Sequence, residues 1–310
     1  EQAQNDALGY FLWLYCELSS AAETRALLSL KTEEIEMLGL FAQYLEAICY
    51  WEDADSGHWE EVRKISASSI GAVVRGLQAL QALVVGRNVR ADWVERLAEL
   101  RSHGQKALKD LLPWESRGDE ISREYDAALL FLISPLNVVS REQAEQILSR
   151  VQENLAGEYG IARYPYDSFW CRDFQELDKS IQTAQYTGRQ AWLKEHIRAV
   201  KRGEEAQWCI FDTIISAIYG QRYQPSGNAD YLTAQIAFFN RAIGQITGEG
   251  NKVLAGADDG EPVDIPANRC PELYYLQHDE YMPNVSTPLL WTQANLCIAL
   301  KMLEKSLESV

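Results

Sequence analysis

Two adjacent glutamates follow a tryptophan in the stretch SGHWEEVRKISASSIG, residues 56–71. A carboxyl group can donate or accept a proton during a reaction, so this pair of glutamates beside Trp59 is a candidate for acid–base chemistry. The same stretch also has a purely structural interpretation. Acidic residues in the first turn of a helix complement the positive end of its dipole, by about 0.3–1 kcal/mol each. A catalytic role for Glu60 therefore requires a second carboxylate elsewhere in the chain.

The second candidate carboxylate is Glu272, in the stretch CPELYYLQHDEY. It follows a proline, has aromatic neighbours and precedes the last long segment with helical periodicity. Two loop carboxylates, each beside aromatic residues and each ahead of a long helix, suit a two-carboxylate hydrolytic site. An acidic chain offers many such pairs, so this pattern alone does not select Glu272.

Helices must position these residues, because apolar residues recur three and four apart along nearly the whole chain. We predict about ten helices and no series of strands with a period of two. Consecutive helices of this size indicate stacked antiparallel hairpins, which can close into a toroid whose inner helices surround a pocket. The predicted helices cover residues 7–18, 33–51, 68–84, 90–112, 125–133, 141–155, 191–201, 207–219, 231–247 and 288–307.

Three connections between these helices have the composition of functional loops: residues 53–64, 157–185 and 248–287. The last two run to about thirty and about forty residues, well beyond the usual length of a connection. Both are rich in aromatic residues and carboxylates. We therefore expect them to form an ordered binding surface, although each aromatic residue taken singly could also pack in the core.

The charge of the chain restricts its partners. Forty-five acidic residues against 29 basic residues give a net charge of −16. Such a charge repels phosphate backbones and anionic lipids, so we predict no nucleic acid and no membrane as partners, whereas a neutral sugar is not repelled. The first residues, EQAQNDALGYFLWLYC, lack the basic region of a signal peptide and enter an apolar-periodic stretch directly. We expect an N-terminal part of the domain to lie outside this sequence.

The six cysteines and four histidines show no metal-binding pattern. The cysteines are widely spaced without a CxxC pair, and no histidine has the spacing of a metal ligand. We interpret the cysteines as mostly buried thiols in a reducing compartment and predict a cytoplasmic protein, while an exported protein could pair some of them. We predict no metal and no cofactor.

Six segments in order resemble one family. The stretch DSGHWEEVRKISASSIGAVVRGLQAL resembles the central motif of the glucoamylase-like glycoside hydrolases, family 15. It looks closer still to the amino-terminal domain of the phosphorylase kinase alpha and beta subunits, which share that fold. The other matching segments are QNDALGYFLW, LLPWESRGDEISREYDAALLFLISP, GEYGIARYPYDSFW, GEEAQWCIFDTIISAIYG, and CPELYYLQHDEY together with TPLLWTQANLCIAL.

The resemblance implies an all-α (α/α)6 toroid of helical hairpins, with residues 1–310 as a single, N-terminally incomplete catalytic domain. It implies an inverting, exo-acting hydrolase that releases glucose from α-glucans or oligosaccharides, with Glu60 as general acid and Glu272 as general base. The base must stay ionised, so we expect tyrosine or tryptophan donors around it, and we expect Glu60 to be buried against Trp59. Substrate binding is assigned to Asp6, Trp59, Glu61, Arg163, Asp167, Glu204 and Trp208.

Several features leave alternatives open. Asn5 stands where glucoamylases have an arginine, and Leu273 stands where many have a glutamine. Arg163 could instead be a buried ion-pair partner of Asp167. The alternative function is a non-catalytic glucan-binding or regulatory module like the kinase subunits, which also keep acidic residues at both glutamate positions. The sequence identifies no protein partner.

Overall fold

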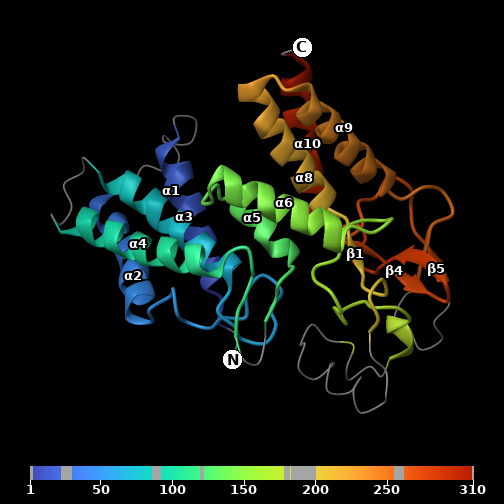
Figure 1. Ribbon diagram of the computed structural model, residues 1–310, viewed down its shortest axis with the longest axis horizontal. Helices are drawn as coiled ribbons and strands as arrows, with labels where there is room; N and C mark the ends of the chain where they lie inside the picture. The colour runs from blue at the N-terminus through green and yellow to red at the C-terminus, as the bar shows by residue number, and fades with distance from the viewer. Residues whose placement is uncertain are drawn as a thin grey trace. The chain divides into compact units, whose positions relative to one another are not determined.

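The structure is a computed structural model that describes residues 3–21, 30–85, 92–118, 122–177, 182, 200–254 and 262–308. Its contacts divide the chain into two compact units (Figure 1). Unit 1 comprises Glu1–Glu124 and Phe131–Ala144, and unit 2 comprises Tyr125–Leu130 and Glu145–Val310. We describe each unit by itself, and a single domain over residues 1–310 stays a prediction.

Unit 1 is built around a buried helix. This helix, α3, packs against α1 and α4, and its leucines at positions 77 and 80 are fully buried. By length and composition α3 is the one described helix that could span a membrane, but 78% of its apolar window is buried inside the protein, as in a core helix. The long helices of unit 1 are α1 (Asn5–Ser20), α2 (Thr32–Ala47), α3 (Ala67–Val84) and α4 (Trp93–Leu111).

Glycines allow α1 and α3 to approach each other closely. A Cβ atom on Gly9 would lie 2.4 Å from the backbone carbon of Ala72, and a Cβ atom on Gly76 would lie 2.7 Å from the backbone oxygen of Gly9. Any larger side chain at either position would push the two backbones apart. The contact fixes the position of the start of α1 relative to α3.

Large apolar side chains are exposed on one face of α1 and on one face of α2. One of these two helices, α1, is the helix predicted at residues 7–18. The spacing of three and four residues places each helix's exposed side chains on a single stripe. The exposed residues are Phe11, Leu14 and Leu18 on α1, and Met37, Leu40 and Tyr44 on α2.

After α4 the chain forms the short elements η1 (Ala127–Leu129) and α5 (Leu130–Ile133), and then α6 (Arg141–Leu155). In unit 2 the buried helix is α8, against which α9 and α10 pack. A three-stranded antiparallel sheet has the order β1-β4-β5, with Trp208 opposite Leu273 and Tyr274 opposite Pro283, and β2 pairs with β3. The remaining elements are η2 (Phe174–Glu176), β1 (Gln207–Trp208), α8 (Ile210–Ser226), α9 (Ala229–Gly244), β2 (Lys252–Leu254), β3 (Pro262–Asp264), β4 (Leu273–Gln277), β5 (Glu280–Pro283) and α10 (Leu290–Glu308).

Most of the predicted helices are confirmed, with one correction. The described residues also form five short strands, which the sequence analysis did not locate because runs of two to five residues are too short to show alternation, and the predominantly helical fold class is unaffected. The helix predicted from residue 207 begins only at Ile210, because Trp208 exchanges backbone hydrogen bonds with Ile161 instead. The helix predicted at 191–201 lies almost entirely outside the described residues.

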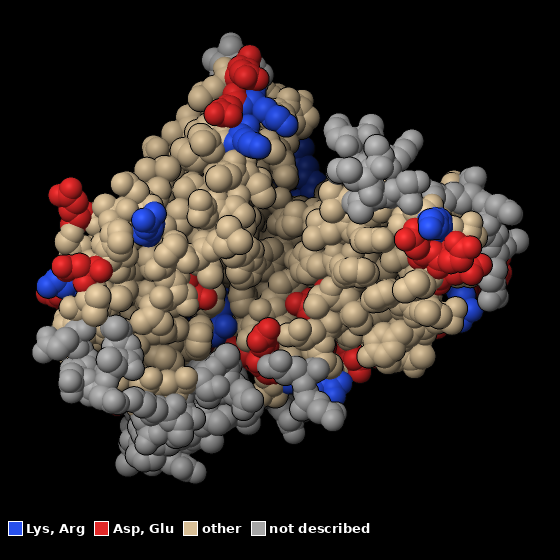
Figure 2. All heavy atoms as spheres, turned by 180° about the vertical axis from the view of Figure 1, so that it is seen from behind, with Lys and Arg blue, Asp and Glu red and all other residues tan. Residues whose placement is uncertain are grey.

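The excess negative charge is dispersed over the face shown in Figure 2. On that face the described acidic and basic side chains form small separate groups. The net charge of −16 is therefore not gathered into one patch there.

Candidate active site

The loop of residues 53–64 precedes α3, but its glutamates do not lie in the first turn of that helix. The helix begins at Ala67, and its first turn contains no acidic residue. Glu115 takes that place, since its carboxylate accepts hydrogen bonds from the backbone nitrogen of Ser68 at 3.1 Å and from its hydroxyl at 2.5 Å. Glu60 is therefore not a helix-start charge, and the structural interpretation of the two glutamates is wrong.

Glu60 is exposed, while the residues on both sides of it are buried. Its φ of 52° lies in the left-handed region, which turns the carboxylate outward between Trp59 and Glu61. The carboxylate accepts a hydrogen bond from the side-chain amide of Gln4 at 3.1 Å. The expectation that Glu60 would be buried against Trp59 is wrong, because it is the indole that enters the core.

The segment with the sequence QND lies directly beside this loop. The backbone nitrogen of Ser56 donates to the backbone oxygen of Ala3 at 2.7 Å, and that of Asn5 donates to Asp55 at 3.1 Å. Asp6, which is 8% exposed, has a carboxylate oxygen 3.6 Å from Nδ1 of His58. We call the residues gathered here the Glu60 cluster: Gln4, Asp6, Asp55, His58 and Glu60.

Asp55 and His58 are members of this cluster that the sequence reasoning did not single out. Asp55 is 1% exposed, and burial raises its pKa to about 6, helped by the nearby charge of Asp6 and opposed by the hydrogen bond from the backbone nitrogen of Asn5. The His58 ring stacks on Phe131 with 4.9 Å between ring centroids. In the sequence, the composition of the whole loop of residues 53–64 indicated this region, and nothing singled out Asp55 or His58.

Glu61 was assigned to substrate binding, and the structure places it in a buried ion pair. Its side chain is 1% exposed and contacts the guanidinium of Arg123, whose side chain is 6% exposed. This buried contact joins the loop of residues 53–64 to Arg123 and holds it in place. Within unit 1, Glu60 is thus the glutamate of the pair whose carboxylate reaches solvent.

Unit 2 holds the second candidate, Glu272, immediately before β4. Its backbone oxygen accepts a hydrogen bond from Cys209 at 3.0 Å, which fixes it beside β1. Its carboxylate accepts a hydrogen bond from the side-chain amide of Asn284. Burial raises the pKa of Glu272, and the bond from Asn284, the charge of Arg163 and the nearby hydroxyl of Ser286 oppose that rise.

The expected tyrosine or tryptophan donors around Glu272 are therefore replaced by a side-chain amide. Asn284 follows directly on β5, and the antiparallel pairing of β4 with β5 returns the chain to Glu272. The backbone nitrogen of Asn284 also donates to Leu273 at 3.2 Å. A hairpin that escaped the sequence reasoning thus supplies the donor.

Arg163 lies at the centre of the second group of residues. It is 4% exposed, and its guanidinium donates to both carboxylate oxygens of Asp167, at 2.7 and 2.8 Å. The same guanidinium lies 5.1 Å from the centroid of the Trp208 ring. The buried ion pair left open above is confirmed, and its charge also acts on Glu272. We call these residues the Glu272 cluster: Arg163, Asp167, Trp208, Glu272 and Asn284.

Glu204, assigned to substrate binding, uses its carboxylate in a local turn. The carboxylate accepts a hydrogen bond from the backbone nitrogen of Lys201 at 3.0 Å. Its neighbour Glu205 is buried and accepts hydrogen bonds from the backbone nitrogens of Tyr166 and Gly203, both at 2.6 Å. Glu205 therefore braces the loop that carries Arg163.

The chain was compared with known proteins. No family model matches it. A curated relative, "Probable phosphorylase b kinase regulatory subunit alpha" of Caenorhabditis elegans, is 30% identical over 148 residues, which are 44% of this chain and 12% of the relative. The chain therefore spans a small part of that relative's length.

Solved structures with a similar fold are glycosidases. A wild-type glycosidase superposes with a TM-score of 0.60 at 17% identity, covering 98% of this chain and 67% of its own. A glycosidase variant in complex with glucose gives 0.59 at 16% identity, with the same coverage of 98% and 67%. A bacterial glucoamylase complexed with acarbose gives 0.52 at 12% identity, covering 86% of this chain and 37% of its own. These findings confirm the predicted resemblance and the glucoamylase-like α/α fold class.

Proposed function

We propose that this chain is the catalytic domain of an inverting, exo-acting hydrolase that releases glucose from α-glucans or oligosaccharides. The observation that carries the proposal is the environment of Glu272, a half-buried carboxylate held by Asn284 in a glucoamylase-like fold. The proposal assigns Glu60 and Glu272 to the acid and the base of one reaction.

Glu60 is the proposed general acid. Its carboxyl group protonates the glycosidic oxygen as the bond to the anomeric carbon breaks. The hydrogen bond from Gln4 supports this role, because it fixes the direction of the carboxyl group while leaving the group open to solvent. Asp6, in the same cluster, is the proposed partner of hydroxyl groups on the terminal sugar.

Glu272 is the proposed general base. It accepts a proton from the water that attacks the anomeric carbon, so an α-linked substrate yields β-glucose. A base must be ionised, and the bond from Asn284 together with the charge of Arg163 favours its charged form. The same donor holds the carboxylate in one orientation toward the water.

Of the remaining assigned residues, some are proposed to contact the sugar and others to support the loops that carry those residues. Trp208, with Arg163 against its ring, is the proposed aromatic wall of the sugar site, and Trp59 is the proposed wall beside Glu60. The carboxylates of Glu61 and Glu204 support the loops that carry these residues. The substrate is an α-glucan or an oligosaccharide.

The test is the reaction of the chain with maltooligosaccharides, followed by the anomer of the glucose released. Glu60→Gln keeps the shape of the side chain but removes its transferable proton, so turnover should fall by about 10²–10⁴-fold. Glu272→Gln should lose activity comparably. Wild-type turnover in Glu60→Gln with an unchanged melting temperature would refute the assignment.

Glu61→Gln is the matched control for the acid. It should lower the melting temperature, because it removes the carboxylate charge that contacts the buried guanidinium of Arg123. The turnover of the folded fraction should change far less than in Glu60→Gln. Comparing the Glu60→Gln and Glu61→Gln variants thus distinguishes a loss of catalysis from a loss of stability.

A second candidate function is a non-catalytic glucan-binding or regulatory module. It is favoured by the curated relative, whose 30% identity exceeds the 12–17% of the solved glycosidases and whose name describes a regulatory subunit. Binding of maltose without any release of glucose would select this function. Release of β-glucose would select the hydrolase.

We also propose that the protein acts in the cytoplasm. None of the six cysteines is in a disulfide, and three of them, Cys16, Cys171 and Cys209, are buried. Six cysteines without a disulfide fit a reducing compartment.

A further inference from the structure

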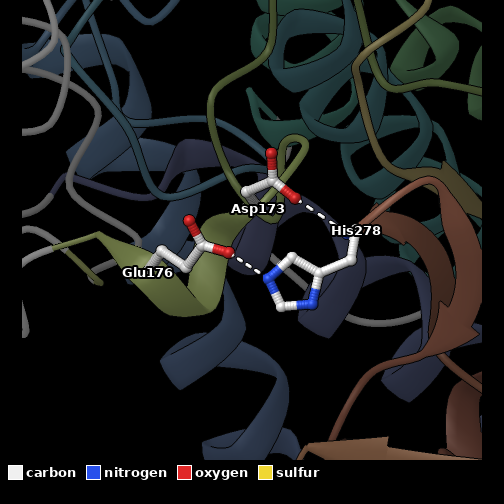
Figure 3. A group of neighbouring side chains, drawn as sticks. All are labelled: Asp173, Glu176 and His278. Carbon is white, nitrogen blue, oxygen red and sulfur yellow. Dashed lines mark hydrogen bonds and ion pairs between the residues drawn. The ribbon is translucent and has the colours of Figure 1, made fainter.

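Two carboxylates and an imidazole meet at one point in unit 2 (Figure 3). Asp173, Glu176 and His278 each offer one ligand atom, and these atoms lie within 4.8 Å of one another. Nε2 of His278 contacts Oε1 of Glu176 directly. We call these three residues the His278 cluster.

The backbone fixes the positions of this cluster. Asp173 immediately precedes η2, and its backbone nitrogen donates to the backbone oxygen of Leu276 in β4 at 2.9 Å. Its carboxylate accepts from the backbone nitrogen of His278 at 2.9 Å. His278 lies in the two-residue turn between β4 and β5, so η2 and the hairpin are held together at the point where the ligand atoms converge.

A buried amide points into the same cluster. Gln277 is 3% exposed, and its Nε2 lies 3.2 Å from Oε1 of Glu176 and 3.4 Å from Nε2 of His278. Its Oε1 is buried and has no hydrogen-bond partner within the described part of the chain. The orientation of the amide rests on these two contacts of Nε2, because Oε1 makes none to the described residues. A half-turn of the amide gives up the two contacts and presents the carbonyl oxygen to the cluster as a fourth donor.

The ligand types suit a divalent cation. Asp173 and Glu176 supply carboxylate oxygens and His278 supplies an imidazole nitrogen, which are donors that such cations bind. Among the described residues, the guanidinium of Arg172 contacts Asp173 and Asp279.

We propose that the His278 cluster, with the side-chain oxygen of Gln277, binds a divalent transition-metal cation such as Zn²⁺. One imidazole nitrogen with carboxylate and amide oxygens is a donor set that Zn²⁺ accepts, and the remaining positions are open to water because Glu176 and His278 are exposed. The cation connects η2 to the C-terminal end of β4, the strand that begins one residue after Glu272. This revises the expectation of no metal, and it does not depend on the proposed hydrolase activity.

The test is titration of the full chain with ZnCl2 by calorimetry, after treatment with EDTA and exchange into a non-chelating buffer. We expect one site with micromolar affinity and a melting temperature that rises with Zn²⁺ and falls again with EDTA. His278→Ala and Glu176→Gln should each weaken binding by about 10-fold or more. Glu280→Gln, an exposed carboxylate of the same hairpin, is the matched control and should leave the affinity unchanged.

Gln277→Glu separates a cation site from a simple ion pair. With a cation in the cluster, the added carboxylate should tighten Zn²⁺ binding and enlarge the rise in melting temperature. Without a cation, the same substitution places a charge against Glu176 and lowers the melting temperature. Absence of Zn²⁺ binding by the wild type, or equal affinity in wild type and His278→Ala, would overturn the proposal.

Discussion

Asp55 should make the stability of the protein fall as pH rises through the weakly acidic range. This carboxyl group is 1% exposed, and burial raises its pKa from 3.8 to about 6. Between these values the folded protein keeps a proton on Asp55 that the unfolded chain has lost, so the folded state binds more protons and stability declines with pH. The favourable contribution is complete below about pH 4 and is lost as pH rises through about 6.

The size of this effect follows from the shift. A difference of about 2 pKa units at about 1.4 kcal/mol each corresponds to about 3 kcal/mol of unfolding free energy. The Asp55→Asn variant keeps an oxygen to accept the hydrogen bond from Asn5 but cannot ionise. The variant should therefore lack this part of the pH dependence.

The assay is urea unfolding of the wild type and Asp55→Asn between pH 4 and pH 7.5. Other groups titrate in both proteins, so the informative quantity is the difference between the two free energies at each pH. That difference should move in favour of the variant by about 3 kcal/mol as pH rises. Glu52→Gln, at an exposed position directly before this loop, should run parallel to the wild type. Parallel curves for Asp55→Asn would refute the reasoning.

Two further predictions concern the packing of unit 1 and the proposed base. Gly9→Ala should cost about 1–3 kcal/mol, because the new Cβ meets the backbone of Ala72 at 2.4 Å. Gly244→Ala, with nothing within 4 Å of the new Cβ, should cost nothing in the same thermal melts. Asn284→Ala removes a donor to Glu272 and raises its pKa further, so the acidic limb of kcat/KM should move to higher pH; an unmoved limb would exclude Glu272 as the base.

The sequence predicted most of the helices, because helical periodicity is written into each segment itself. It could not predict which of two neighbouring glutamates reaches solvent, since that depends on the left-handed φ of Glu60 and on Arg123, which lies 62 residues from Glu61 in the chain. The cap of α3 was missed for a similar reason. Glu115 reaches Ser68 across 47 residues, and no local pattern announces it.

The candidate site was predicted in part. The motifs located both Glu60 and Glu272, but the donor to Glu272 comes from a hairpin whose strands are too short to leave an alternating pattern. The His278 cluster was not predictable from spacing, because His278 lies 102 residues from Glu176. Such a set forms only when the fold brings distant loops together.

The β4–β5 hairpin separates positions that tolerate a change of chain length from those that do not. Side chains alternate between the two faces of a strand, so one inserted residue within β4 would shift every pairing with β5 and carry Asn284 away from Glu272. The turn at His278 and Asp279 lies outside the ladder and can lengthen without this penalty. Across homologous chains the hairpin should therefore vary in length at its tip, so that the ligands of the proposed cation site can be gained or lost while the position of Glu272 is kept.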